Sequence, residues 1–159
     1  MSNLITVLLL SLLFAPSSIL TADLAENTEK TIVGTWVSVD HDSGEERSHI
    51  RIYKAKNGMY YGKIVKLLFK PEGQENPVCT RCPKNDYRYN QPIVGLIVIS
   101  RLKAAKDLKS AVKGKVLDPE SGAIVDCQIE VADNGNKLKV RGYWKLPSIG
   151  LTQTWKRLK

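Results

Sequence analysis

The chain has 159 residues, of which 43% are hydrophobic and 25% charged, and its formal net charge at pH 7 is +8. This length and composition fit a single domain with its own core. The positive charge would attract polyanions, but no basic motif interleaved with aromatic residues is present, which argues against nucleic acid as the partner.

The first 22 residues resemble a cleaved export signal. No charged side chain occurs from Ser2 to Ala22, an apolar run covers 4–14, and Ala22 closes an acceptable small-residue cleavage site. A membrane anchor needs about 20 apolar residues, and Pro16 interrupts the run too early. We therefore expect a signal peptide over 1–22, a flexible segment over 23–30 and one domain over 31–159. This organisation predicts a periplasmic or secreted protein with no transmembrane segment after cleavage.

The rest of the chain alternates between apolar and polar residues in short stretches that are typical of strands. Turn signals at 56–58, 118–122 and 133–136 separate several of them. The stretch 101–109 is ambiguous between a turn and a short helix near Ala104, and 68–92 is a long, Pro-rich loop of unassigned role. We expect strands at 31–40, 48–53, 59–67, 95–100, 110–117, 122–131, 137–144 and 150–158.

About eight short strands joined mostly by tight turns favour a small antiparallel up-and-down β-barrel. Such a barrel pairs its first strand with its last. Here those strands would carry Trp36 and Trp155, whose rings could plug one end with basic residues stacked on them. A β-sandwich is the alternative, but its crossovers need long connections, and only 68–92 is long.

Several strings resemble, as an ordered set, a bacterial exported family of unknown function with a lipocalin-like domain, domain-of-unknown-function family 2147. They are Gly34-Thr35-Trp36, Tyr61-Gly62-Lys63-Ile64-Val65, Asn76-Pro77-Val78-Cys79 with Cys82, Asp118-Pro119-Glu120-Ser121-Gly122, Val140-Arg141-Gly142-Tyr143 and Thr152-Gln153-Thr154-Trp155. The resemblance implies a calycin-type barrel in the bacterial envelope, with no established reaction. The family's last strand usually carries Arg immediately before the Thr-Gln-Thr-Trp string, where this chain has Leu151.

Cys79 and Cys82 have the Cys-x-x-Cys spacing of a small disulfide ring, a metal site or a thiol-exchange site. We expect a disulfide between them, because exported thiols at this spacing on a loop should oxidise. Cys127 shares its strand face with apolar residues, which predicts a buried free thiol. Its pairing with Cys79 or Cys82 is the competing possibility, and the sequence does not choose between the two.

No catalytic motif, metal-ligand spacing or cofactor-binding motif stands out, so we predict a non-catalytic protein. The favoured function is binding of a small apolar or amphipathic molecule inside the barrel, although a packed interior without a cavity is equally compatible. One alternative is an envelope module whose basic exterior binds an anionic surface or protein partner, and another is a thiol-redox protein using Cys79 and Cys82. The expected ligand-binding residues are Trp36, Ile50, Ile52, Tyr61, Val140, Gln153 and Trp155.

Overall fold

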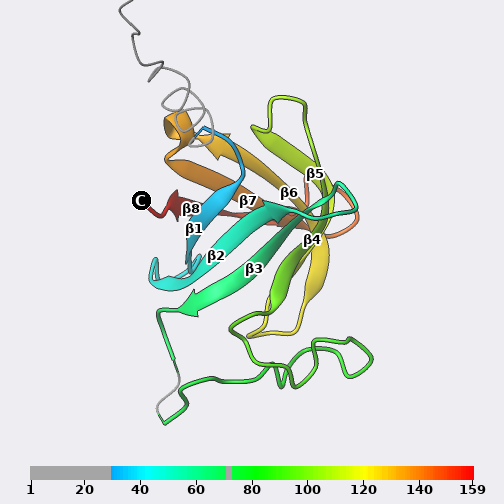
Figure 1. Cartoon of the computed structure of the whole chain (residues 1–159). Coiled ribbons are helices and arrows are strands. Elements are labelled where there is room, and N and C mark those ends of the chain that lie inside the picture. Colours follow the sequence, from blue (N-terminus) through cyan, green and yellow to red (C-terminus); the bar gives the residue numbers. More distant parts are fainter. Residues whose placement is uncertain (1–29, 71–72) are drawn as a thin grey trace, which may run out of the picture.

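Eight antiparallel strands form a closed barrel in the computed structural model, which describes residues 30–70 and 73–159 (Figure 1). Each strand pairs with the next along the chain, and the last returns to the first, so the predicted barrel class is confirmed. The strands are β1 Gly34–Val39, β2 Glu46–Lys54, β3 Tyr60–Leu67, β4 Ile97–Ala104, β5 Ser110–Leu117, β6 Ile124–Ala132, β7 Lys137–Tyr143 and β8 Gly150–Arg157.

The barrel closes where β1 and β8 lie side by side, with Trp36 opposite Arg157 and Val37 opposite Lys156. The expected first-to-last pairing is therefore present. The export signal expected over 1–22, and all of the segment expected to be flexible except Lys30, lie outside the described residues. Among the described residues, no helix is long and apolar enough to cross a membrane.

Of the two structures left open for 101–109, the turn is present and the short helix near Ala104 is not. Strand β4 continues to Ala104, and a turn follows in which the Ala105 N–H donates to Ser110 O at 2.9 Å. Arg101 has a φ of +60°, which sends its own side chain outward and lets Leu102 point into the barrel. The only helical segment among the described residues is the 3₁₀ turn η1 at Asp133–Gly135.

Small residues let large ones fill the barrel. Gly62 and Gly114 face inward on β3 and β5, and a Cβ atom on either would touch the side chains of Ile99 or Leu102. Both of these large residues are completely buried. The other inward-facing side chains that form this core include Trp36, Ile50, Ile52, Tyr60, Ile64, Ala111, Cys127, Ile129, Leu138, Val140 and Trp155.

The long connection between β3 and β4 packs on the outside of the barrel and adds a second layer there. Val98 and Leu117 point outward by strand alternation, yet only 3% and 2% of their surfaces are exposed. The connection contributes its own buried residues, and the Arg88 guanidinium fixes it by donating to Ile97 O at 3.0 Å. Gly122 is required where the connection meets the β5–β6 turn, because its φ is +77° and a Cβ atom would lie 1.9 Å from Arg81 O. The buried residues of the connection are Pro77, Cys79, Cys82, Arg88, Ile93 and Leu96.

The two ends of the barrel differ. We call the end that carries residues 30–33, the turns 55–59, 105–109 and 133–136 and the C-terminus the closed end. The other end, which we call the loop end, carries the connections 40–45, 68–96, 118–123 and 144–149. In Figure 1 the long green connection extends away from the strands at the loop end.

The tight approach at Gly114 predicts a stability effect. In Gly114→Ala the new Cβ would lie 2.6 Å from Leu102 Cδ2 and 2.9 Å from Ser100 O. We expect the free energy of unfolding in urea to fall by about 1–3 kcal/mol, the usual cost of overpacking a core. Gly142→Ala is the matched control, since its Cβ would meet Val125 Cγ2 at 3.1 Å and should cost less. Equal losses in the two variants would contradict this account of the core.

Candidate functional site

Five of the seven predicted ligand-binding residues come together inside the barrel. Trp36, Ile50, Ile52, Val140 and Trp155 all point inward and are at most 4% exposed. Trp36 and Ile52 have no exposed surface, so no water-sized space adjoins them. The interior around these residues is filled by side chains.

Tyr61 lies outside this group, so its predicted position in the lining is wrong. Its neighbours Tyr60 and Gly62 take the inward positions, and alternation therefore turns Tyr61 to the outer face. There its ring stacks on Tyr53 with centroids 6.3 Å apart, and its hydroxyl accepts a hydrogen bond from Asn57 Nδ2 at 2.8 Å. Tyr60 and Tyr61 are consecutive, so one of them must face into the barrel and the other outward. The turn signal at 56–58 did not show which of the two faces inward.

Arg157 seals the closed end, although it was not among the predicted site residues. Its guanidinium carbon lies 4.0 Å from the centroid of the Trp36 ring. Its nitrogens donate to the backbone oxygens of Thr31, Val33 and Gly135, which belong to two segments far apart in the sequence. Gly34 leaves room for this contact, because its φ is +138° and a Cβ atom would lie 2.6 Å from Arg157 Nη1.

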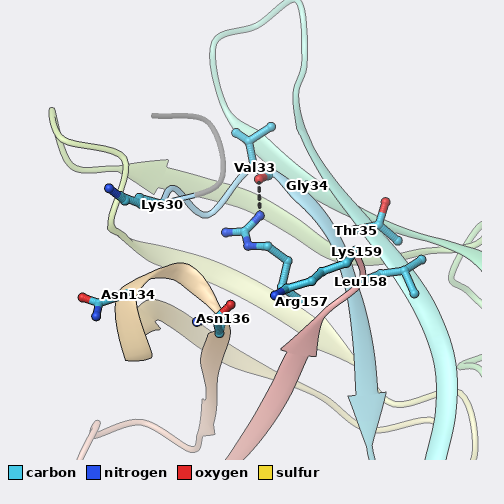
Figure 2. Close-up of a pocket in the computed structure, with 9 residues that line it drawn as sticks. All are labelled: Lys30, Val33, Gly34, Thr35, Asn134, Asn136, Arg157, Leu158 and Lys159. Atoms are coloured by element: carbon cyan, nitrogen blue, oxygen red, sulfur yellow. Dashed lines mark hydrogen bonds between the residues drawn. The ribbon is translucent and has the colours of Figure 1, made fainter. Parts of the chain in front are cut away.

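A hollow of about 260 Å³ lies beside this seal at the surface of the closed end (Figure 2). Figure 2 shows Arg157 between the segment at Val33 and the turn at Asn136, with the hydrogen bond to Val33 O marked. The hollow therefore overlies the seal rather than leading into the barrel. Its lining mixes basic, amide and apolar side chains, and consists of Lys30, Val33, Gly34, Thr35, Asn134, Asn136, Arg157, Leu158 and Lys159.

The loop end has a different character. Strand pairing places Val116, Val125, Gly142, Leu151 and Gln153 on the inward face of β5 to β8, yet all of them are partly or largely exposed. Leu151 is 49% exposed even though it follows the inward phase of Trp155. We call these five residues the mouth.

Gln153 is the polar member of the mouth. Its Oε1 accepts a hydrogen bond from the Trp155 indole N–H at 3.0 Å, which satisfies a donor that would otherwise be buried unpaired. Within residues 30–70 and 73–159, its Nε2 group makes no hydrogen bond to the protein. The mouth therefore combines an apolar wall with one amide donor, and no charged side chain is part of it.

The three cysteines occupy two environments. The Sγ atoms of Cys79 and Cys82 lie 1.99 Å apart, which is the disulfide pairing expected from their spacing. Cys127 is a buried free thiol inside the barrel, so it does not fasten the long connection. Since Cys79 and Cys82 are 1% and 3% exposed, the bridge is shielded from an attacking thiolate and its evident role is structural.

One largely buried ion pair, between Arg88 and Asp86, lies in the long connection. The Arg88 side chain donates to both carboxylate oxygens of Asp86 and lowers the pKa of that carboxyl. The described residues contain no group of three or more His, Cys, Asp or Glu side chains that could hold a metal ion.

The family profile described as "Uncharacterized protein conserved in bacteria (DUF2147)" matches residues 34–157, and the chain belongs to this family. No curated protein matches the sequence. Among solved structures, the chain is similar to protein HP1028 from the human pathogen Helicobacter pylori, which is described as belonging to the lipocalin family. The two are 22% identical with a TM-score of 0.65, and the match covers 80% of this chain and 83% of HP1028. The fold is therefore lipocalin-like, as the motif resemblance implied.

The seal predicts that Arg157 stabilises the barrel far more than its neighbour does. Arg157→Lys keeps the charge but loses the planar fork that reaches three carbonyls, so we expect the free energy of unfolding to fall by roughly 2–3 kcal/mol. Lys156→Gln is the matched control, because it removes only the exposed ion pair with Glu46 at 2.9 Å and should cost less than about 1 kcal/mol. Urea denaturation of both variants measures the difference, and similar losses would contradict the seal.

Burial of Cys127 predicts a pH dependence. The apolar surroundings raise the pKa of this thiol to about 12, whereas a thiol in the unfolded chain titrates near about 8.5. The stability that this group contributes is complete below about pH 8.5 and is lost as the pH rises toward about 12, since only the unfolded chain releases the proton in that range. Between pH 8 and 10.5 we expect the wild type to lose on the order of 2 kcal/mol more than Cys127→Ala in urea denaturation. Parallel losses in the two proteins would refute the assignment.

Proposed function

We propose that this member of the DUF2147 family is an exported binding protein that holds a small apolar or amphipathic molecule at the mouth. The observation that carries the proposal is the contrast between the two ends of one interior. Trp36 and Ile52, nearer the closed end, have no exposed surface, whereas the inward-facing residues of the mouth are partly or largely exposed.

The chemistry of the mouth supports a ligand with an apolar body and one hydrogen-bond acceptor. Val116, Val125 and Leu151 would remove water from the apolar part, and the Gln153 Nε2 group would donate to the acceptor. Binding sites commonly divide the work in this way, with apolar contacts giving affinity and a few polar groups giving orientation. The lipocalin-like fold also favours a non-catalytic binding role over an enzyme.

This proposal moves the ligand away from the residues first expected to hold it. The barrel interior next to the mouth is filled by buried side chains, among them Trp36, Ile52 and Trp155. A ligand bound among these residues would have to displace packed side chains. Of the predicted ligand-binding residues, Gln153 is the one that belongs to the mouth. The apolar segment before Pro16 and the Cys79–Cys82 bridge support an exported, oxidising location.

Uptake of the neutral fluorescent probe N-phenyl-1-naphthylamine tests the site. Val125→Phe places a ring at the mouth, and we expect it to weaken probe binding at least tenfold while leaving the unfolding midpoint close to that of the wild type. Val112→Phe is the matched control, because Val112 is 43% exposed on the outer face of β5. Its probe affinity should stay within about twofold of the wild type.

A second pair of changes separates the mouth from the basic exterior. Lys113 and Lys115 are exposed on the outer face of β5, so Lys113→Glu with Lys115→Glu should leave probe binding unchanged. Binding that ignores Val125→Phe but is lost with the two lysines would overturn the proposal in favour of an anionic partner on the exterior. A wild type that binds no apolar probe would overturn it as well.

A further inference from the structure

The turn between β7 and β8 presents large apolar side chains to solvent. Trp144, Leu146 and Ile149 are 63%, 58% and 63% exposed, and Leu151 follows them at the start of β8. They lie within eight consecutive residues at the end of β8 away from the C-terminus (Figure 1). Isolated exposed apolar residues are ordinary on a protein surface, but a cluster of this kind marks a site of interaction.

The turn is held in one conformation. The Arg141 guanidinium donates to Pro147 O at 2.7 Å, to Ser148 O at 3.3 Å and to Thr152 Oγ1 at 2.8 Å. The Trp144 N–H also donates to Ile149 O at 3.0 Å across the base of the turn. The apolar side chains are thus displayed by a braced scaffold, which lowers the entropy lost on docking.

We propose that this turn docks the protein onto a lipid bilayer surface that contains anionic lipid. Tryptophan favours the boundary between headgroups and acyl chains, because its ring is apolar and its indole N–H remains hydrated. Leu146 and Ile149 would enter the acyl region, while Lys145 extends its charged end toward the headgroups.

The charge of the chain favours an anionic surface. From Asn134 to Lys159 the sequence has no Asp or Glu. Basic side chains near an anionic bilayer each contribute to attraction within the screening length. Two basic residues of this segment lie at the turn, Lys145 within it and Arg141 bracing it, whereas Lys137, Lys156, Arg157 and Lys159 belong to the closed end.

The small size of this apolar turn favours a bilayer over a protein as its partner. A stable protein interface takes about 20–30 residues from each side, whereas the turn has the six residues 144–149. A bilayer needs only a few inserted side chains together with electrostatic attraction. The inference stands independently of the proposed ligand, because it rests on Trp144, Leu146 and Ile149, which are not part of the mouth.

Sedimentation with vesicles tests the inference. We expect the purified protein to bind vesicles of phosphatidylcholine with phosphatidylglycerol, and to bind phosphatidylcholine alone more weakly. Trp144→Ser with Leu146→Ser and Ile149→Ser should reduce binding to the mixed vesicles at least tenfold. Val65→Ser with Val112→Ser is the matched control, since these residues are exposed on the outer faces of β3 and β5, and its binding should equal that of the wild type.

Tryptophan fluorescence gives a second readout on the unaltered protein. Trp36 is completely buried and Trp155 is 3% exposed, so quenching by acrylamide reports Trp144. The mixed vesicles should protect Trp144 from acrylamide and shift its emission to shorter wavelength. Probe binding at the mouth is measured without vesicles, so failure of one proposal is distinguishable from failure of the other.

Three results would overturn the lipid assignment. The first is a wild type whose Trp144 remains fully quenchable in the presence of the mixed vesicles. The second is vesicle binding that survives the triple substitution. The third is a dimer in solution that the triple substitution abolishes while vesicles bind neither protein, which would make a second copy of the chain the occupant of the turn.

Discussion

The barrel depends on the contact that joins its first strand to its last. Strands β1 and β8 share two register pairs, whereas β7 and β8 share seven. Two register pairs give few backbone hydrogen bonds between these strands. The Arg157 side chain adds further contacts, because it stacks on the Trp36 ring and donates hydrogen bonds to Val33 O and Gly135 O. A guanidinium suits this place because it is planar, always charged and has donors that point in several directions.

This seal explains why the two ends of the interior differ. The large rings of Trp36 and Trp155 and the arginine occupy the closed end, where the first and last segments must be held together. At the loop end Gly142 takes an inward position beside Val125, so less volume fills the space between the strands. The residues of the mouth are therefore left partly exposed.

The sequence predicts the architecture well because turn residues and alternation act locally. A turn is present at 118–122 as expected, with Gly122 in the left-handed conformation, and Cys127 has the buried position expected from its apolar neighbours. The features that the sequence did not predict depend on local departures from regular strand geometry and on which of two similar residues faces inward. Arg101 adopts a φ of +60° that extends β4 through a stretch with the composition of a helix or a turn, and Tyr60 rather than Tyr61 takes the inward phase. Of the mouth, only Gln153 was predicted, because the exposure of an inward-facing residue depends on which side chains fill the space around it and not on its own type.

The mouth and the β7–β8 turn adjoin at Leu151. This residue is the second of β8, where its inward phase makes it part of the mouth and its position places it next to the turn that carries Trp144 and Ile149. A bilayer docked on that turn would bring the mouth close to the acyl chains, where an amphipathic molecule is most concentrated. A ligand leaving the bilayer there would meet an apolar wall before it met bulk water, which removes the costly step of hydrating its apolar part. If both proposals hold, the placement of the mouth and the turn at one end would favour a membrane-derived amphiphile over a ligand taken from solution.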